Sequence, residues 1–376
     1  MLNNLITVGA LFAVFANASL IHNQPRDGVI TLDLVLPTNE DLEKRQIGET
    51  DYFLKGTNWP KAVVQVGSNK DSVLLVVDTG SWLVQVPDIS SNCSACLLPN
   101  GEVGLFNSNK STTIERTGKP FKSKFDQNAY YYGEAVIDDI WLGSNFKIPK
   151  VLFNDVSDIG KGWPYGLLGL AKPPKGSENE NVVLSAYKAG LISKPIASLH
   201  SRNSSGTSLQ LFLGGYSKAQ TIEPFSWHSI RDSNIHAYID SFSINGKNIP
   251  VNSNATFDTG NSRIFVHKDV YSGILNALPD DPNNAKGSNK IDYSLIKDKT
   301  FTLTLFGKNY TIPLIAFIEP DCQDQHCGLM VFSTAAYNIG SALLRFLNLA
   351  IDYEVGNEKI GLAQWKASNT NNVVSF

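Results

Sequence analysis

One six-residue pattern occurs twice in this chain, and each copy carries an aspartate. Val76-Val77-Asp78-Thr79-Gly80-Ser81 returns 180 residues later as Thr256-Phe257-Asp258-Thr259-Gly260-Asn261. Two carboxyl groups held close together cannot both ionise easily, so they share one proton. The ionised member can take a proton from water while the protonated member donates one to a carbonyl oxygen. The repeat therefore predicts a catalytic pair for amide hydrolysis, Asp78 and Asp258.

The residues beside each aspartate suit such a pair. Gly80 and Gly260 allow the backbone to turn sharply and to approach the opposite loop. The hydroxyls of Thr79 and Thr259 can bond across the pair and hold it. The alternative interpretation is two structural turns in which each aspartate caps its own strand. The symmetry of the repeat favours the catalytic pair.

A second repeat divides the chain into two similar halves. Leu167-Leu168-Gly169-Leu170 follows the first aspartate, and Asn338-Ile339-Gly340-Ser341 follows the second. Glycine and proline are plentiful (29 and 17), and Val, Ile, Thr, Phe and Tyr recur in short runs. This mixture is typical of short strands joined by tight turns. The 376 residues therefore predict an all-β protein with an N-terminal lobe at residues 46–218 and a C-terminal lobe at residues 219–376.

The charge composition narrows the function classes. Only 18% of the residues are charged, the formal net charge is -3, and no Lys/Arg stripe or run occurs. A nucleic-acid-binding protein gathers positive charge on one face or along one helix. We therefore expect no nucleic-acid partner.

The first 45 residues are typical of secretion and processing. An apolar run at residues 5–15, followed by Ala16-Asn17-Ala18, predicts a signal peptide over residues 1–18. A transmembrane helix is the alternative, but the run is shorter than the roughly 20 residues that a span needs. Residues 19–45 end in Lys44-Arg45, which predicts a propeptide and a mature chain that starts at Gln46. The alternative is that this basic dipeptide occurs by chance.

The rest of the chain fits the same route. Residues 371–376 lack the hydrophobic tail of a lipid-anchored protein, so we expect a secreted, extracellular protein without a membrane anchor. Four cysteines allow three pairings, and their grouping as Cys93/Cys96 and Cys322/Cys327 favours two local disulfides. A thioredoxin-like or zinc-binding motif is the alternative for the first pair. The candidate glycosylation sites are Asn92, Asn109, Asn203, Asn254 and Asn309.

Further stretches follow the aspartate motifs in a fixed order. They are Val86-Pro87-Asp88, Gly166-Leu167-Leu168-Gly169-Leu170-Ala171, Leu211-Phe212-Leu213-Gly214-Gly215, Ile339-Gly340 with Leu344-Arg345, Ile351-Asp352-Tyr353 and Ile360-Gly361-Leu362-Ala363. In these stretches and their order the chain resembles the pepsin-like aspartic proteases, and among them the secreted fungal, candidapepsin-like branch. The resemblance covers nearly all of the expected mature chain.

The resemblance implies a fold and a mechanism. It implies two β-barrel-like lobes with pseudo-twofold symmetry and a central cleft, in which an extended polypeptide substrate lies under a hairpin flap. Asp78 and Asp258 would hold the attacking water, with crossed hydrogen bonds from Thr79 and Thr259 beneath them. Ser81 would bond the outer oxygen of Asp78. The resemblance also implies inhibition by pepstatin-type compounds, a monomer, and no metal or organic cofactor.

The chain departs from the family pattern at the flap. The flap is expected within residues 121–133, where Phe125 takes the place of the usual tyrosine. Gln85 takes the place of the tryptophan that bonds this tyrosine in the family. Losing both partners together is expected to leave no unpaired buried donor. The flap tip, with Gln127 and Asn128, lacks the usual glycine.

Two further departures lie near the second aspartate. Asn261 replaces the usual Ser or Thr, and its amide is expected to donate to Asp258; Ser341 replaces the usual Asp. These changes raise the alternative of a catalytically weak or inactive homologue that binds peptide or protein in its cleft. A lectin-like binding protein, the third interpretation, would require both repeats to be coincidence.

Overall fold

The fold is described from a computed structural model. It describes residues 28–34, 59–91, 93, 96–125, 130–143, 145–160, 165–177, 180–222, 224–230, 234–281, 289–319, 322, 326–368, 370 and 372–376. Strands predominate in these residues and the helices are short; none of these helices is long and apolar enough to cross a membrane. The expected signal peptide, Lys44-Arg45 and Gln46 lie outside the described residues.

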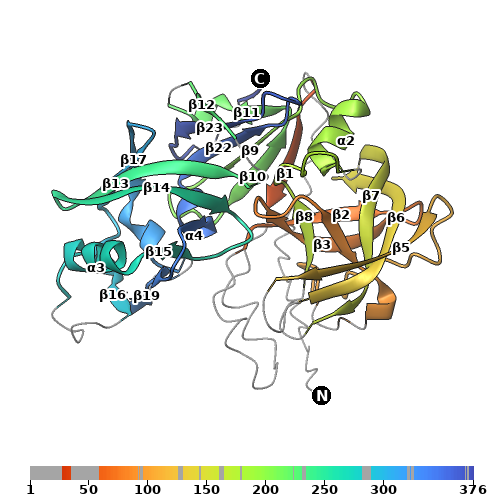
Figure 1. The fold of residues 1–376 in the computed structure, drawn as a ribbon, viewed down its shortest axis with the longest axis horizontal. Coiled ribbons are helices and arrows are strands. Elements are labelled where there is room, and N and C mark those ends of the chain that lie inside the picture. Colours follow the sequence, from red (N-terminus) through yellow and green to blue (C-terminus); the bar gives the residue numbers. More distant parts are fainter. Residues whose placement is uncertain are drawn as a thin grey trace, which may run out of the picture.

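The N-terminal lobe is a seven-stranded sheet that closes on itself (Figure 1). Its strands are β2 (Lys61–Val66), β3 (Asp71–Asp78), β4 (Val84–Pro87), β5 (Glu115–Lys124), β6 (Tyr130–Leu142), β7 (Phe146–Ile159) and β8 (Gly166–Gly169). They are ordered β2-β3-β8-β4-β7-β6-β5, and β2 also pairs with β6, which closes a barrel. The last six residues of β3 are all buried, because both faces of a central strand meet protein rather than water.

The C-terminal lobe contains a second seven-stranded sheet, ordered β18-β17-β13-β14-β21-β15-β20. Its strands are β13 (His236–Ile244), β14 (Lys247–Asp258), β15 (Ile264–Val266), β17 (Thr300–Leu305), β18 (Lys308–Pro313), β20 (Val331–Ser333) and β21 (Asn338–Gly340). Helix α3 (Lys268–Ala277) packs against β14 and buries Val270 and Ile274, which share one helical face. A small separate sheet pairs β16 (Lys290–Asp292) with β19 (His326–Gly328).

The two lobes repeat one arrangement where the aspartates lie. β3 ends at Asp78 and runs parallel to β8, with Asp78 opposite Gly169. β14 ends at Asp258 and runs parallel to β21, with Asp258 opposite Gly340. A Cβ at Gly340 would lie 2.3 Å from the carbonyl oxygen of Arg263, so only glycine fits there. The predicted two-lobed, pseudo-twofold all-β fold is confirmed.

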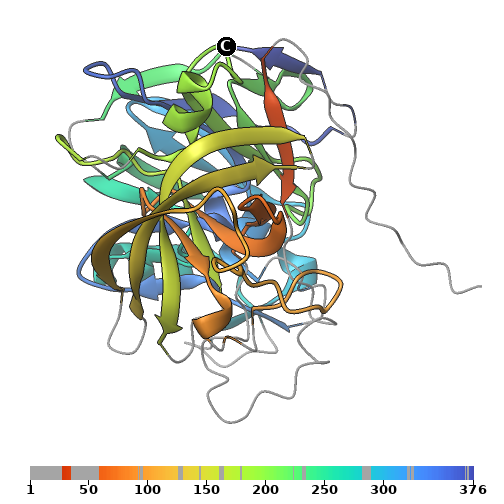
Figure 2. The same ribbon diagram turned by 90° about the vertical axis from the view of Figure 1, so that its right-hand side faces the viewer.

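A six-stranded antiparallel sheet joins the lobes, ordered β1-β10-β9-β22-β23-β12 (Figures 1 and 2). Its strands are β1 (Ile30–Leu34), β9 (Ile196–Ser201), β10 (Leu209–Leu213), β12 (Ser226–Ser229), β22 (Leu347–Asp352) and β23 (Lys359–Gln364). The expected lobe boundary between residues 218 and 219 falls in the short 3-10 helix η3 (Lys218–Gln220), and three of these strands come from each side of it.

The remaining elements are short. They are the pair β11 (Gly215–Ser217) and β24 (Val373–Ser375), the helices α2 (Val182–Lys188) and α4 (Ser341–Leu344), and the 3-10 helices η2 (Ile89–Ser91), η4 (Tyr293–Leu295) and η5 (Leu314–Phe317). Ser341, where the family usually has Asp, is the first residue of α4 and is buried. The pairing of β24 with β11 holds the last residues of the chain beside the lobe boundary.

The two disulfides have the local pairing that the sequence favours. Cys93 and Cys96 are bonded with their Cα atoms 5.4 Å apart, and Cys322 and Cys327 with theirs 5.6 Å apart. Bonds that close loops this small restrict the unfolded chain little, so they fix the shape of two loops. Since both thiols are bonded, the first pair is neither a zinc site nor a free dithiol. The described residues contain no group of three or more His, Cys, Asp or Glu that could hold a metal.

Strand β1 comes from residues 19–45, the stretch that the sequence assigned to a propeptide. It pairs with β10 over five residues, from Ile30 opposite Leu213 to Leu34 opposite Leu209. Ile30, Leu32 and Leu34 alternate along the strand and are 0%, 6% and 6% exposed, as one buried face of a strand requires. Burial of each stabilises the fold by roughly 1.5–3 kcal/mol. This part of the stretch is therefore a structural strand of the sheet that joins the lobes.

Replacing Ile30 with alanine is expected to lower the free energy of unfolding by about 2–5 kcal/mol, because it leaves a cavity at a fully buried site. Denaturant unfolding of the full chain, followed by tryptophan fluorescence, measures this change. Thr31→Ala, on the other face of β1, is the matched control and should cost less than about 1 kcal/mol. Equal values for the two variants would show that β1 is not held in the sheet.

Candidate active site

The two aspartates of the repeated motif meet between the lobes. Asp78 is the last residue of β3 and is 6% exposed, and Asp258 is the last residue of β14. The two carboxyl groups interact directly, since both the charge of Asp258 and a hydrogen bond to its side chain act on Asp78. Each lobe thus contributes one carboxyl group to a single pair.

Glycine follows each Asp-Thr step because the opposite carboxyl group fills the space that a side chain would need. A Cβ at Gly80 would lie 2.6 Å from Oδ1 of Asp258. A Cβ at Gly260 would lie 2.3 Å from Oδ1 of Asp78. Contacts this short force the neighbouring atoms to shift. The two glycines therefore permit the close approach of the carboxyl groups.

Thr79 and Thr259 lie beneath the pair and form four hydrogen bonds between the lobes. The Thr79 hydroxyl donates to the Phe257 carbonyl (2.7 Å) and accepts from the Thr259 backbone N–H (2.9 Å). The Thr259 hydroxyl donates to the Val77 carbonyl (2.6 Å) and accepts from the Thr79 backbone N–H (3.1 Å). Both side chains are buried. The structure thus contains the crossed arrangement that the resemblance implied.

Thr79→Val is expected to lower the free energy of unfolding by about 2–4 kcal/mol, because it leaves the Phe257 carbonyl and the Thr259 N–H buried and unpaired. Thr79→Ser keeps the hydroxyl and should cost less than about 1.5 kcal/mol. Denaturant unfolding of both variants provides the measurement. A valine variant as stable as the serine variant would contradict the stabilising role of the crossed bonds.

The surroundings of Asp78 favour its protonated form. Burial raises the pKa of Asp78 most, the charge of Asp258 raises it further, and the result is a pKa of about 7 against an ordinary value of 3.8. Hydrogen bonds from the Ser81 side chain and from the backbone N–H of Gly80, 2.7 Å from Oδ1, act in the opposite direction. Burial outweighs them. At acidic pH, Asp78 therefore carries a proton.

The amide that donates to Asp258 belongs to Asn338, not to Asn261 as the sequence led us to expect. Nδ2 of Asn338 donates to Oδ2 of Asp258 over 3.0 Å. Nδ2 of Asn261 donates instead to Oδ1 of Asn338 (2.9 Å) and to the Arg263 carbonyl (2.9 Å). Oδ1 of Asn261 accepts from the Arg263 backbone N–H (3.0 Å). The reason is the tight turn from Asn261 to Arg263, which engages the Asn261 amide locally.

Asn338 is the site residue that sequence reasoning missed. It is the first residue of β21, which runs parallel to β14 and lies beside the second aspartate. The sequence offered one signal, because Asn338 opens the segment Asn338-Ile339-Gly340-Ser341 that matches Leu167-Leu168-Gly169-Leu170 in the first half. A polar residue where the matching segment has an apolar one points to a polar neighbour.

The expected flap coincides with the hairpin of β5 and β6, where β5 ends at Lys124 and β6 begins at Tyr130. Phe125 is 41% exposed, and its ring packs edge-on against Tyr131 with centroids 5.1 Å apart. Tyr131 is buried, and its hydroxyl donates to the Tyr165 carbonyl. Gln127 and Asn128 lie outside the described residues.

Gln85 is buried in β4, at 2% exposure. Among the described residues its Oε1 has no hydrogen-bond partner. The same is true of Nδ2 of Asn154, the residue opposite it on β7. The sequence predicted that joint loss of the tryptophan and the tyrosine leaves no unpaired buried donor. Among the described residues, Gln85 in place of the tryptophan leaves an unpaired acceptor, and Asn154 opposite it has an unpaired donor. This polar group lies one strand away from the hairpin.

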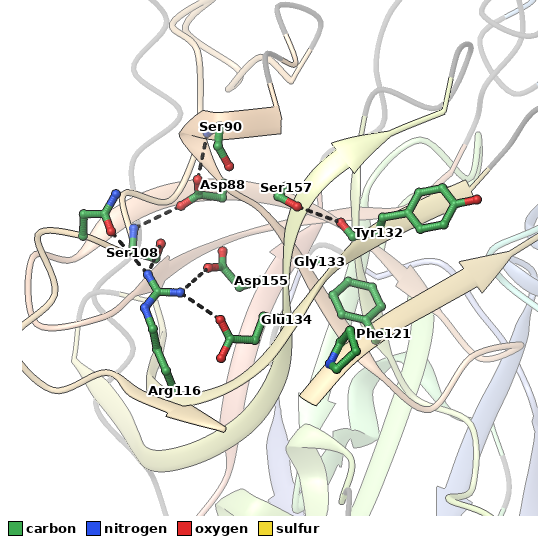
Figure 3. Close-up of a pocket in the computed structure, with 12 residues that line it drawn as sticks. Asp88, Ser90, Ser108, Arg116, Phe121, Tyr132, Gly133, Glu134, Asp155 and Ser157 are labelled. Atoms are coloured by element: carbon green, nitrogen blue, oxygen red, sulfur yellow. Dashed lines mark hydrogen bonds and ion pairs between the residues drawn. The ribbon is translucent and has the colours of Figure 1, made fainter. Parts of the chain in front are cut away.

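A cavity of about 550 Å³ is lined by residues of this hairpin and of the neighbouring strand β7, with Arg116, Glu134 and Asp155 among them (Figure 3). Arg116 reaches across it to Glu134 (3.2 Å) and Asp155 (3.7 Å), and donates to the Ser108 hydroxyl (3.0 Å). Burial, and then the charge of Asp88, raise the pKa of Asp155 to about 7. Below that pH the cavity holds a neutral Asp155 beside the Arg116–Glu134 ion pair.

Asp155→Asn is expected to raise the melting temperature at pH 7 by about 2 °C or more, and to leave it unchanged at pH 4. The folded pKa lies above the unfolded value of 3.8, so the stability that the protonated Asp155 contributes is lost as pH rises from about 4 to about 7. Thermal unfolding at both pH values provides the measurement. Asp158→Asn, an exposed position on β7, is the control. A gain of equal size at pH 4 would contradict the assignment to titration.

The candidate glycosylation sites differ in accessibility. Asn109, Asn254 and Asn309 are exposed. Asn203 is half-buried, and its amide donates to the Thr207 hydroxyl (2.8 Å) and accepts from the Thr207 N–H (2.9 Å). Asn92 lies outside the described residues. Because a glycan is added to Nδ2 and needs room at the surface, the three exposed asparagines are the better candidates.

Comparison with known proteins identifies the class to which this fold and site belong. A family model described as "Eukaryotic aspartyl protease" matches residues 61–365. Candidapepsin-1 of Candida albicans (strain WO-1) is 24% identical over 399 residues, covering 99% of this chain and 98% of that protein. Candidapepsin-3 of the same strain is 26% identical over 336 residues, covering 83% and 81%. Secreted aspartic protease 8 of Candida albicans is 23% identical over 337 residues, covering 88% and 82%.

The protein is a hydrolase, an aspartic endopeptidase with two β-rich lobes. The chain belongs to the eukaryotic aspartyl protease family, and the relatives it resembles are candidapepsins and other secreted aspartic proteases of Candida albicans. The match runs from the first residue of β2 to the residue that follows β23, so it spans both aspartate motifs.

Proposed function

We propose that Asp78 and Asp258 are the catalytic pair of this endopeptidase and that they hydrolyse peptide bonds in extended polypeptides. One observation carries the proposal: the two aspartates lie together at the ends of two equivalent strands, and the pKa of Asp78 is raised to about 7. Because the pair shares one proton, it offers an acid and a base at the same place. The enzyme should lose activity as pH rises through about 7, where Asp78 gives up that proton.

The reaction follows from the shared proton. The ionised carboxylate takes a proton from water, whose oxygen attacks the carbonyl carbon of the peptide. The protonated carboxyl donates its proton to the carbonyl oxygen, so a neutral diol forms. In the second half, the protonated carboxyl gives its proton to the amide nitrogen and the ionised one takes a proton from the diol. The C–N bond then breaks, and the pair again holds one proton.

The β5–β6 hairpin is the part of the N-terminal lobe that would cover an extended substrate bound at this pair. We assign it as the flap, with the exposed ring of Phe125 as an apolar surface for substrate side chains. Phenylalanine offers no hydroxyl, so it contacts substrate through its ring alone. The same surface would receive pepstatin-type inhibitors. We expect a monomer, because one chain supplies both aspartates.

Secretion is supported by the relatives, which are named as secreted proteases. We propose that residues 1–18 direct export and that a processing protease cuts after Lys44-Arg45. Strand β1 precedes that dipeptide and pairs with β10. A cut there would separate β1 from β2 along the chain without breaking this pairing.

Asp258→Asn is expected to lower kcat on denatured casein by about 100- to 10,000-fold, because it removes one of the two proton-transfer groups. The assay runs from pH 3 to 7 with and without pepstatin, and circular dichroism checks the fold. Asp298→Asn, an exposed carboxyl in the same lobe, is the control and should leave kcat unchanged. Normal cleavage by Asp258→Asn would overturn the assignment of the pair.

The same assay tests the second candidate function. A weak or inactive homologue that binds peptide is favoured by the exchanges at Phe125 and Gln85. Within the described part of the chain, Gln85 leaves a buried acceptor unpaired. Folded wild-type protein that binds pepstatin but cleaves nothing from pH 3 to 7 would support this function over catalysis.

A further inference from the structure

The two aspartates stand in matching backbones but have different polar neighbours. Asp78 has the side chain of Ser81, three residues further along the chain, as a hydrogen-bond partner. The position three residues after Asp258 is Asn261, whose amide is engaged by Arg263 and Asn338. The donor to Asp258 comes from another strand, β21, through Asn338. The two strand ends therefore match in backbone structure, but Asp78 has a side-chain donor from its own turn and Asp258 has one from the neighbouring strand β21.

The orientation of the Asn338 amide is fixed by Asn261. An asparagine side chain can present either its oxygen or its NH₂ group to a neighbour, and only the NH₂ group donates. Nδ2 of Asn261 donates to Oδ1 of Asn338 (2.9 Å), so Nδ2 of Asn338 faces Oδ2 of Asp258 (3.0 Å). Asn261 is itself held by both backbone groups of Arg263. The backbone of Arg263 thus orients the Asn261 amide, which orients the Asn338 amide toward the Asp258 carboxylate.

A neutral donor beside a carboxylate favours the ionised form, because the hydrogen bond is stronger to a charged acceptor. Among the described residues, the titratable group that interacts with Asp258 is Asp78, at the end of β3. Asn338 from β21 and Asn261 from the turn after β14 are uncharged. Burial and then the charge of Asp258 raise the pKa of Asp78, so the proton of the pair is drawn to Asp78.

We propose that Asn338, oriented by Asn261, is a positioning residue that holds Asp258 as the ionised member of the pair and fixes its Oδ2. This role rests on the proposed catalytic function of Asp78 and Asp258. Asn338 acts through Asp258 and does not itself transfer a proton. Ser81 likewise lowers the pKa of Asp78, but Asp78 is buried whereas Asp258 is half-buried, and at Asp78 burial outweighs the hydroxyl.

Asn338→Leu removes the donor while keeping a similar side-chain size. We expect kcat to fall about 10- to 100-fold with KM changed less than about threefold, because the ionised base is lost rather than substrate contacts. The acidic limb of the pH profile of kcat/KM should move upward by about half a unit or more, since the carboxylate loses a stabilising donor. Asn276→Leu, at an exposed position of α3, is the control for a leucine in the same lobe.

The double variant Asn261→Ser/Asn338→Leu tests the mechanism by rescue. A serine hydroxyl three residues after Asp258 recreates the arrangement of Ser81 with Asp78. We expect the double variant to recover at least about tenfold of the lost kcat and to return the acidic limb toward its wild-type position. An Asn338→Leu variant that matches wild type in both readouts, or a folded double variant with no recovery, would overturn the proposal.

A measurement that does not depend on catalysis tests this inference separately from the proposed function. The ¹³C signals of labelled aspartate, assigned with Asp258→Asn, follow the titration of the pair directly. The lower pKa of the pair should rise in Asn338→Leu and fall back in the double variant. Wild-type protein without pepstatin-sensitive cleavage would contradict the proposed function, yet this titration would still decide whether Asn338 controls the charge of Asp258. An unchanged titration in Asn338→Leu would overturn the proposal.

Discussion

The four hydrogen bonds between Thr79 and Thr259 decide how the two lobes meet, and the site depends on them. Each hydroxyl donates to the backbone carbonyl that precedes the opposite aspartate and accepts from the opposite threonine N–H. The separation of the carboxyl groups is thus set by backbone atoms rather than by side-chain rotamers. Glycine must follow each threonine, because the opposite carboxyl group fills the space of a Cβ.

The chemistry needs asymmetry, and the side chains around this symmetric backbone provide it. Burial raises the pKa of Asp78 against the hydrogen bonds of Ser81 and Gly80. Asp258 instead receives the Asn338 amide, which is oriented by Asn261. A pair in which both carboxyl groups had the same neighbours would not assign the proton to one of them. The exchange of a hydroxyl for two amides near Asp258 is therefore compatible with catalysis.

Much of the site was predictable because it lies in local sequence. The Asp-Thr-Gly motifs and the bonds of their threonines across the pair follow from two short segments. The Ser81 contact and the hairpin around Phe125 were implied by the family resemblance rather than by these segments alone. The hydrogen bonding of Asn338 and Gln85 was harder to predict from the sequence. Whether a buried amide finds a partner depends on residues from other strands, such as Asn154 opposite Gln85. The raised pKa of Asp155 likewise depends on burial at the hairpin and then on the charge of Asp88.

The sequence by itself indicated the aspartate pair, the two β-rich halves and the local cysteine pairing, because repeats and short residue spacings can be read directly from the order of residues. The tertiary structure alone decided which amide donates to Asp258, since the turn at Asn261 competes for its own side chain. It also decided that residues 30–34 are a strand of the sheet between the lobes. Their alternation of apolar residues was visible, but the partner, β10, begins 175 residues further along the chain, and only packing brings the two together.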